Sequence, residues 1–233
     1  MIIRYVTLKS KYKSRFIYTL RFFSSLWLAL GIGIFAASAA NDQYRLVALG
    51  DSLTAGYGLK SSDSFPAQLQ KLLKIKGYNA TVQNAGVSGD TTAGGLARLD
   101  WSLGEDVDGV IIELGANDAL RGVLPGATLT SLENIIIRLK QRNIDVLLTG
   151  MLAPPNLGPD YGKSYNTIFP DLAKKYDLVF YPFFLKDVAT IPSLNQSDGI
   201  HPTAEGVKII TRNILPKVEE LLNNSDRYRR KAQ

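Results

Sequence analysis

Short apolar runs alternate with amphipathic stretches along the chain from residue 44 onward. Most of the runs are rich in Val, Ile, Leu or aromatic residues and end near a glycine or a polar turn, as buried strands do. The clearest is Gly-Val-Ile-Ile-Glu-Leu at residues 109–114, which is followed by Gly115. Strands are therefore expected at residues 44–49, 80–83, 109–114, 145–149 and 178–181.

The stretches between these runs have the apolar spacing of helices that bury one face. In the first of them the apolar residues are Phe65, Leu69, Leu72, Leu73 and Ile75, and Gly77 is a stop signal. Helices are expected at residues 64–76, 92–103, 129–142, 165–176 and 203–222. Strands that alternate with such helices form right-handed crossovers and a parallel sheet covered on both faces. We predict a three-layer α/β/α fold with a five-stranded, mainly parallel sheet.

The first forty residues have a different pattern. Residues 1–21 contain six basic and no acidic residues, and the uncharged apolar segment 22–40 follows, with small residues at its end. This order is typical of a secretory signal peptide, here cleaved near Ala39 or Ala40. An uncleaved membrane anchor is the alternative, because the segment approaches the length that spans a bilayer. We favour cleavage, since Gly31 and Gly33 weaken a helix. In both cases the protein is expected to be exported, to the periplasm.

Charge and cysteine content narrow the function further. The chain has 27 Lys and Arg residues, and without the six in the signal 21 remain, which equals the number of Asp and Glu residues. A nucleic-acid partner needs a basic stripe on the folded domain, and the only basic cluster left in the mature sequence is at 227–231, in the polar tail. The absence of cysteine excludes disulfides, thiolate metal sites and a cysteine nucleophile. We expect a signal peptide at residues 1–40, one catalytic domain at 41–223 and a polar tail at 224–233.

Three residues near strand ends form a candidate catalytic set. In α/β sheets the reactive groups gather outside the carboxyl ends of the strands, and Ser52 comes directly after the first strand. His201 is the only histidine, and Asp198 lies three residues before it in the turn Ser-Asp-Gly-Ile-His-Pro. Each alone is more typical of a turn or a packing residue. Together they predict Ser52 as the nucleophile, His201 as the base and Asp198 as the acid that orients it.

Acyl transfer also requires hydrogen-bond donors for the oxyanion that forms on the attacked carbonyl. Gly89, in the glycine-rich loop after the second strand, offers an unobstructed backbone N–H. Asn117, after the third strand, offers a side-chain amide. Both are common turn residues, but their joint occurrence after two consecutive strands favours an oxyanion hole.

The ordered blocks GDSLTAGYG, NAGVSGDTT, GANDALRG and DGIHP resemble the four blocks of the SGNH, or GDSL, hydrolases, and most of all their bacterial periplasmic thioesterase and lysophospholipase branch. The resemblance covers residues 44–222. It implies a flavodoxin-like sheet, no metal ion or organic cofactor, and a monomer as a sufficient unit. It also implies the triad Ser52, Asp198 and His201, with an oxyanion hole formed by the Ser52 and Gly89 N–H groups and the Asn117 amide.

The substrate is expected to be a small-molecule ester, thioester or lipid, since the resemblance implies acyl thioesters, aryl esters and lysophospholipids. An apolar acyl groove is predicted from four loop residues, Leu120, Leu124, Leu152 and Tyr161. Two alternatives stay open. A carbohydrate O-deacetylase can use the same catalytic set on a polar substrate, and a non-catalytic binding domain can share the fold. Membrane contact is expected only through the N-terminal segment, if that segment is uncleaved.

Overall fold

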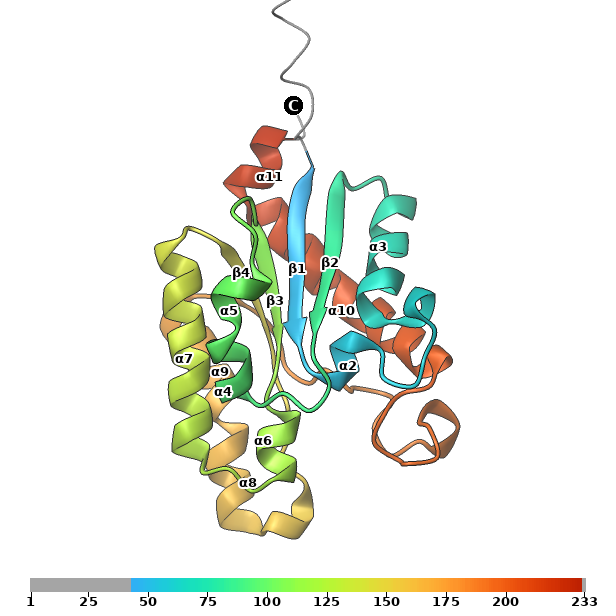
Figure 1. Ribbon diagram of the computed structural model, residues 1–233, viewed down its shortest axis with the longest axis vertical. Helices are drawn as coiled ribbons and strands as arrows, with labels where there is room; N and C mark the ends of the chain where they lie inside the picture. The colour runs from blue at the N-terminus through green and yellow to red at the C-terminus, as the bar shows by residue number, and fades with distance from the viewer. Residues whose placement is uncertain (1–42, 232–233) are drawn as a thin grey trace, which may run out of the picture. The chain divides into compact units, whose positions relative to one another are not determined.

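The computed structural model describes residues 43–231. Its centre is a sheet with the strand order β2-β1-β3-β4-β5 (Figure 1). The strands are β1 (Tyr44–Gly50), β2 (Ala80–Gly86), β3 (Gly109–Glu113), β4 (Asp145–Thr149) and β5 (Val179–Tyr181). All four strand pairings are parallel. The prediction of a five-stranded parallel sheet is confirmed.

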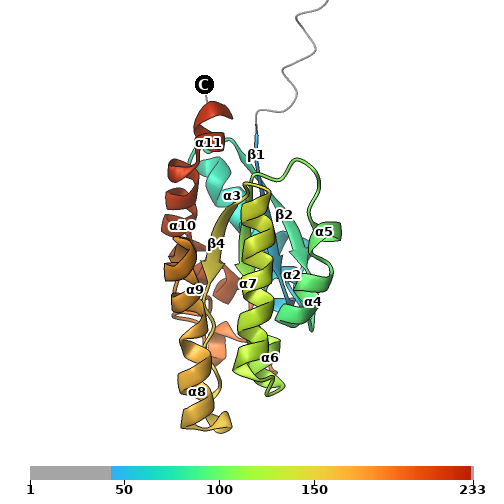
Figure 2. The ribbon, with the colours of Figure 1, turned by 90° about the vertical axis from the view of Figure 1, so that its left-hand side faces the viewer.

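Helices cover both faces of this sheet (Figure 1 and Figure 2). One face packs against α3 (Phe65–Ile75) and α10 (Ala204–Asn224), and the other against α4 (Thr92–Ala97), α5 (Leu99–Ser102), α7 (Pro125–Gln141) and α9 (Ile168–Tyr176). The chain runs from β1 to β2 in one direction across the sheet and then from β2 to β3, β4 and β5 in the other. Because crossovers are right-handed, the helices of the two directions lie on opposite faces. The three-layer α/β/α prediction is confirmed.

The core lies between these layers. The central strands are apolar on both faces, and Val110, Ile111 and Ile112 of β3 are fully buried. The helix α7 packs its apolar face against the sheet, and the residues at the helical spacing are also fully buried: Leu132, Ile135, Ile136 and Leu139. Burying side chains of this size stabilises the fold by about 1.5–3 kcal/mol each. The sheet is therefore a rigid platform for the loops at its carboxyl edge.

Three predicted helices have different boundaries, each for a local reason. The helix expected at 129–142 begins at Pro125. Proline fits the first helical position because N–H groups in the first turn have no acceptor within the helix, so the missing N–H costs no hydrogen bond. The helix expected at 165–176 is split at Thr167, since the ring of Pro170 conflicts with a continuous helix through that point. The helix expected at 92–103 is interrupted at Arg98, whose φ and ψ are −100° and 5°.

Several short elements have no counterpart in the prediction, because three to eight residues contain too little apolar periodicity. They are α2 (Ser52–Ala55), α6 (Ala116–Leu120), α8 (Pro159–Asn166) and the 3₁₀ helices Ser61–Asp63, Pro155–Leu157 and Pro192–Leu194. Two of them, α2 and α6, come directly after β1 and β3 and lie at the lower edge of the sheet in Figure 1. They carry two of the candidate site residues.

The end of the chain packs against the domain. Residues expected as part of a polar tail instead form α11 (Asp226–Lys231). The ring of Tyr228 lies edge-on to that of Tyr44, with centroids 5.9 Å apart, and Arg227 pairs with the buried Asp108 at 3.4 Å. The predicted signal or anchor at residues 1–40 lies outside the described residues. Within residues 43–231, no helix has the length and apolar character needed to cross a membrane.

Candidate active site

The candidate site lies where β1 and β3 end. Ser52 is the first residue of α2 and is nearly buried. The loop after β5 returns to this edge and is closed by a bridge between Asn195 and Pro202. His201 thereby meets a serine that is 149 positions away in the sequence.

Ser52, His201 and Asp198 form a continuous hydrogen-bonded chain. Ser52 Oγ lies 2.9 Å from His201 Nε2, and His201 Nδ1 lies 2.7 Å from Asp198 Oδ2. A carboxylate only accepts hydrogen bonds, so Nδ1 carries the proton and donates it. Nε2 is then left as an acceptor for the Ser52 hydroxyl. The geometry brings the three predicted residues into the order that proton transfer from serine to imidazole requires.

The Asp198 turn fixes its carboxylate from the backbone. Asp198 Oδ1 accepts hydrogen bonds from the N–H groups of Ile200, at 2.9 Å, and His201, at 3.0 Å. These bonds, followed by the imidazole contact, lower the pKa of Asp198 to about 2. The Asp198 carboxylate is therefore ionised from mildly acid pH upward, although its side chain is 37% exposed. Hydrogen bonding, and not burial, holds this acid in place.

Asp51 connects the nucleophile to Asn117. Its Oδ1 caps α2 by accepting from the Leu53 N–H at 2.9 Å, and its Oδ2 accepts from Asn117 Nδ2 at 3.1 Å. A side-chain amide has two N–H donors. Asp51 takes one of them, which orients the amide and leaves the second for another acceptor.

A second buried carboxyl group, Glu113, lies behind Asp51 at the end of β3. Its Oε2 accepts from the Thr54 hydroxyl at 2.7 Å and from the Asp51 N–H at 3.4 Å, whereas its Oε1 has no hydrogen-bond partner among the described residues. Burial, with a smaller contribution from the charge of Asp51, raises the pKa of Glu113 well above its usual value. Burial also raises the pKa of Asp51, to about 6. Both carboxyl groups therefore hold a proton more readily than exposed ones, because burial disfavours the charged form of each.

Gly89 lies in the loop after β2. Its φ of +85° is in the left-handed region that favours glycine, whereas a Cβ there would meet Arg121 Nη2 at an ordinary 3.5 Å. Backbone conformation, and not lack of space, thus requires glycine. Arg121 Nη2 donates to the Gly89 carbonyl at 2.7 Å, which ties this loop to the end of α6.

Further hydrogen bonds connect the loops that carry Ser52, Gly89 and Asn117. Asp118, next to Asn117, accepts from the N–H and hydroxyl of Thr92 at 2.8 and 2.5 Å. Arg98 pairs with Asp90 at 2.5 Å and donates to the Gly50 carbonyl at 2.8 Å. The loops after β1, β2 and β3 are thus connected by buried or half-buried hydrogen bonds, as preorganised donors need.

A pocket of about 540 Å³ opens beside Ser52 and His201. Among the described residues that line it, none is Asp, Glu, Lys or Arg. Two of the four predicted groove residues, Leu120 and Leu152, line this pocket and are about half exposed. The groove also includes residues not predicted for it, namely Met151, Pro154, Pro155, Phe183, Leu185 and Ile200.

Leu124 and Tyr161, the other two predicted groove residues, do not line this pocket. Leu124 is 75% exposed, at the residue before α7. The Tyr161 hydroxyl donates to the Val123 carbonyl at 2.7 Å, and its ring stacks on Tyr165. Tyr161 therefore fastens the loop before α7 to α8, a role that depends on contacts between segments far apart in the sequence.

A family model described as the GDSL-like lipase/acylhydrolase family matches residues 48–209, a range that contains the whole triad. The chain belongs to this family. The match begins within β1 and ends within α10. The family assignment from the four sequence blocks is confirmed.

Relatives of this GDSL-family chain include enzymes and solved structures. It is 39% identical over 178 residues to esterase TesA of Pseudomonas aeruginosa, covering 76% of this chain and 89% of TesA. It is 37% identical over 199 residues to thioesterase 1/protease 1/lysophospholipase L1 of Escherichia coli K12, covering 85% and 93% of the two chains. The crystal structure of AlinE4, an SGNH-hydrolase family esterase, matches with a TM-score of 0.65 and 45% identity, covering 77% and 97%.

Proposed function

We propose that this chain hydrolyses carboxylic esters and thioesters, among them acyl thioesters, aryl esters and lysophospholipids, through an acyl-Ser52 intermediate. The observation that carries the proposal is the chain from Ser52 Oγ through the imidazole of His201 to Asp198, with distances of 2.9 and 2.7 Å. The names of the family relatives support the same class of reaction.

In the first half of the reaction, Ser52 Oγ attacks the carbonyl carbon while its proton passes to His201 Nε2. The carbonyl oxygen takes the electron pair and becomes an oxyanion. We assign its donors to the backbone N–H groups of Ser52 and Gly89 and to the second N–H of the Asn117 amide. The imidazolium of His201, stabilised by Asp198, then protonates the leaving alcohol or thiol as the bond to the acyl group breaks.

In the second half, water gives a proton to His201 Nε2 and attacks the acyl-enzyme carbonyl. The same donors hold the oxyanion, and the carboxylic acid leaves as Ser52 recovers its proton. The apolar pocket beside Ser52 supports acyl chains as the group held during both halves. Its lack of charged lining residues favours acyl esters over acetylated sugars.

Hydrolysis of p-nitrophenyl esters from acetate to palmitate tests this proposal. We expect turnover that peaks at a medium or long chain and that Ser52→Ala removes. Ser225→Ala is the matched control, since Ser225 is also a buried serine, and its hydroxyl donates to Asp145 at the other end of the sheet. Activity confined to acetate would favour a carbohydrate O-deacetylase, and turnover that survives Ser52→Ala would refute the assignment of the nucleophile.

Export and a single-chain active unit are further parts of the proposal. The basic and apolar pattern of residues 1–40 supports export to the periplasm, and all three proposed triad residues come from one chain. Cell fractionation with N-terminal sequencing tests export and cleavage, and a sedimentation measurement during turnover tests the monomer. A protein found only in the cytoplasmic fraction, or active only as an oligomer, contradicts the respective part.

A further inference from the structure

Tyr57 lies directly against the imidazole of His201. The centroids of the two rings are 4.5 Å apart and the ring planes are inclined by 36°. Tyr57 is 52% exposed, so burial of its ring explains little of its placement. Tyr57 does not line the apolar pocket. Its ring covers one face of the imidazole, whereas Ser52 and Asp198 occupy the two ring nitrogens.

The backbone holds Tyr57 in this position from both sides. Its N–H donates to the carbonyl of Ser52 at 3.1 Å, which links it to the turn that carries the nucleophile. The flanking glycines have left-handed φ values of +83° at Gly56 and +73° at Gly58. Glycine adopts such φ values without strain, so the backbone turns on both sides of Tyr57 depend on these two glycines.

Gln196 completes the attachment from the histidine side. Its side-chain amide donates to the carbonyls of Tyr57, at 2.8 Å, and Pro202, at 3.0 Å. Its backbone N–H donates to the carbonyl of His201 at 2.7 Å. A Cβ on Gly58 would approach Gln196 Oε1 to 2.2 Å, so the Gln196 amide would have to move from its place between these carbonyls. The serine turn and the histidine turn are therefore joined through Tyr57 and Gln196.

We infer that Tyr57 is a positioning residue for the proposed reaction, whose aromatic face holds the imidazole of His201 toward Ser52 and stabilises the imidazolium formed during acyl transfer. This inference rests on the proposed function. The face of a phenol ring attracts a cation within about 6 Å of its centroid, and the attraction is strongest for a partly desolvated cation. During the reaction the imidazolium forms as Ser52 loses its proton, so the attraction acts on the transition state more than on bound substrate.

The inference depends on the ring and not on the hydroxyl group. No hydrogen bond of the Tyr57 hydroxyl occurs with any residue that the structure describes, whereas the ring contacts the imidazole. Tyr57→Phe keeps the aromatic face. Tyr57→Leu keeps apolar bulk without that face, and Tyr57→Ala removes both. These three variants separate the contribution of the aromatic face from those of bulk and hydroxyl.

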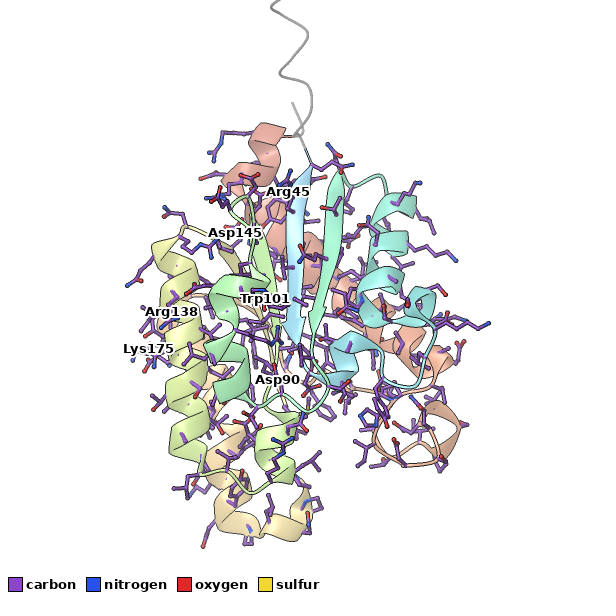
Figure 3. All side chains as sticks on the ribbon, viewed as in Figure 1. Arg45, Asp90, Trp101, Arg138, Asp145 and Lys175 are labelled. Carbon is purple, nitrogen blue, oxygen red and sulfur yellow. The ribbon has the colours of Figure 1, made fainter. Side chains whose placement is uncertain are left out.

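The experiment measures kcat and KM of the purified full chain for p-nitrophenyl butyrate, together with the thermal midpoint. A second readout is the rate at which a small organophosphonate inactivates the enzyme, because this reaction uses the Ser52–His201 pair with little use of the acyl pocket. Trp101→Ala is the matched control, since Trp101 is an 86% exposed aromatic on α5, away from the site (Figure 3).

We expect Tyr57→Phe to keep kcat within twofold of the unmodified chain. Tyr57→Leu and Tyr57→Ala should lower kcat and the inactivation rate by about tenfold, with KM and the thermal midpoint little changed. Three results overturn the inference: a Leu or Ala variant with kcat within twofold, a loss confined to KM, or a Phe variant as slow as the Ala variant. Failure of the proposed function itself is distinguishable, because the unmodified chain would then show no turnover that depends on Ser52.

Discussion

The two ends of the sheet each bring a serine to an aspartate, with different consequences. At the carboxyl end, His201 lies between Ser52 and Asp198. At the amino end, Ser225 Oγ donates directly to Asp145 Oδ2 at 2.5 Å, and the buried Tyr44 hydroxyl donates to the same oxygen at 2.8 Å. Figure 3 labels Asp145 at this end, far from the candidate site.

The imidazole of His201 is the main difference between these two arrangements of serine and aspartate. A carboxylate that accepts hydrogen bonds from two hydroxyl groups is a weak base, so Ser225 remains a hydroxyl and its bond is structural. Burial, and then the charge of Asp145, raises the pKa of Tyr44, which keeps that phenol a donor as well. The surroundings differ too: the amino-end cavity of about 320 Å³ includes Lys140, Asp177 and Glu220, whereas the pocket beside Ser52 is apolar. A Ser–Asp pair therefore becomes a candidate for catalysis only with a base between the two residues and room for an acyl group.

Replacing the two aspartates should separate these roles with the largest effect. Asp198→Asn should lower kcat/KM by roughly 1,000- to 10,000-fold, because an amide no longer selects the tautomer with the proton on His201 Nδ1. Asp145→Asn should leave kcat/KM within twofold. Steady-state hydrolysis of p-nitrophenyl butyrate measures both variants. An Asp198→Asn enzyme that retains a tenth of the activity contradicts the role assigned to Asp198.

Removal of one oxyanion donor should have the next largest effect. Asn117→Ala should lower kcat by roughly 100- to 1,000-fold with a small change in KM, because the lost donor acts mainly on the oxyanion. The half-buried Asn213, whose amide donates to Asp187 at 3.1 Å, offers a matched control in Asn213→Ala. Equal activity of the two alanine variants would exclude Asn117 from the oxyanion hole.

The Asp51–Glu113 pair should make stability depend on pH. The folded-state pKa of Asp51, about 6, lies above its usual value of 3.8, so between these pH values the folded chain binds more protons than the unfolded chain. The free energy of unfolding of the unmodified chain should therefore fall relative to Asp51→Asn as the pH rises from 4 to 6, by roughly 2–3 kcal/mol.

Urea unfolding at pH 4, 5, 6 and 7 measures this difference. Asp198→Asn is the control, and its difference in free energy of unfolding from the unmodified chain should stay nearly constant from pH 4 to 7. The folded-state pKa of Asp198 is lowered to about 2, so its contribution to stability is present above pH 4 and is lost as the pH falls toward 2. A difference between the unmodified chain and Asp51→Asn that does not vary with pH is incompatible with a buried, charged Asp51.

Single changes at the amino end should have the smallest effect. Ser225→Ala and Tyr44→Phe each remove one hydrogen bond to Asp145 and should lower the free energy of unfolding by about 1 kcal/mol. Both should leave kcat/KM within twofold, because neither residue is near the site. Chemical denaturation and ester hydrolysis on the same samples check this prediction, and a large loss of activity without a loss of stability would show that the two ends are coupled.

Much of the candidate site could be predicted because its residues carry local signals. Ser52 and Asn117 come directly after strands that were predicted within one or two residues, and His201 is the only imidazole in the chain. The roles of Glu113 and Tyr57 could not be predicted in the same way. In the sequence, Glu113 is a single polar residue in an apolar strand and Tyr57 is an aromatic residue in a loop. Only the structure shows that they contact Thr54 and His201.

The sequence by itself determined the order of strands and helices, the class of fold, the family and the candidate triad, because apolar periodicity and turn residues act over a few positions. Tertiary structure decided which loop residues share the pocket: it brought Leu120 and Leu152 into the lining and left Leu124 and Tyr161 outside. It also decided that residues 226–231 form a helix against the sheet. These outcomes depend on contacts between segments far apart in the chain, which no local pattern of apolar and polar residues encodes.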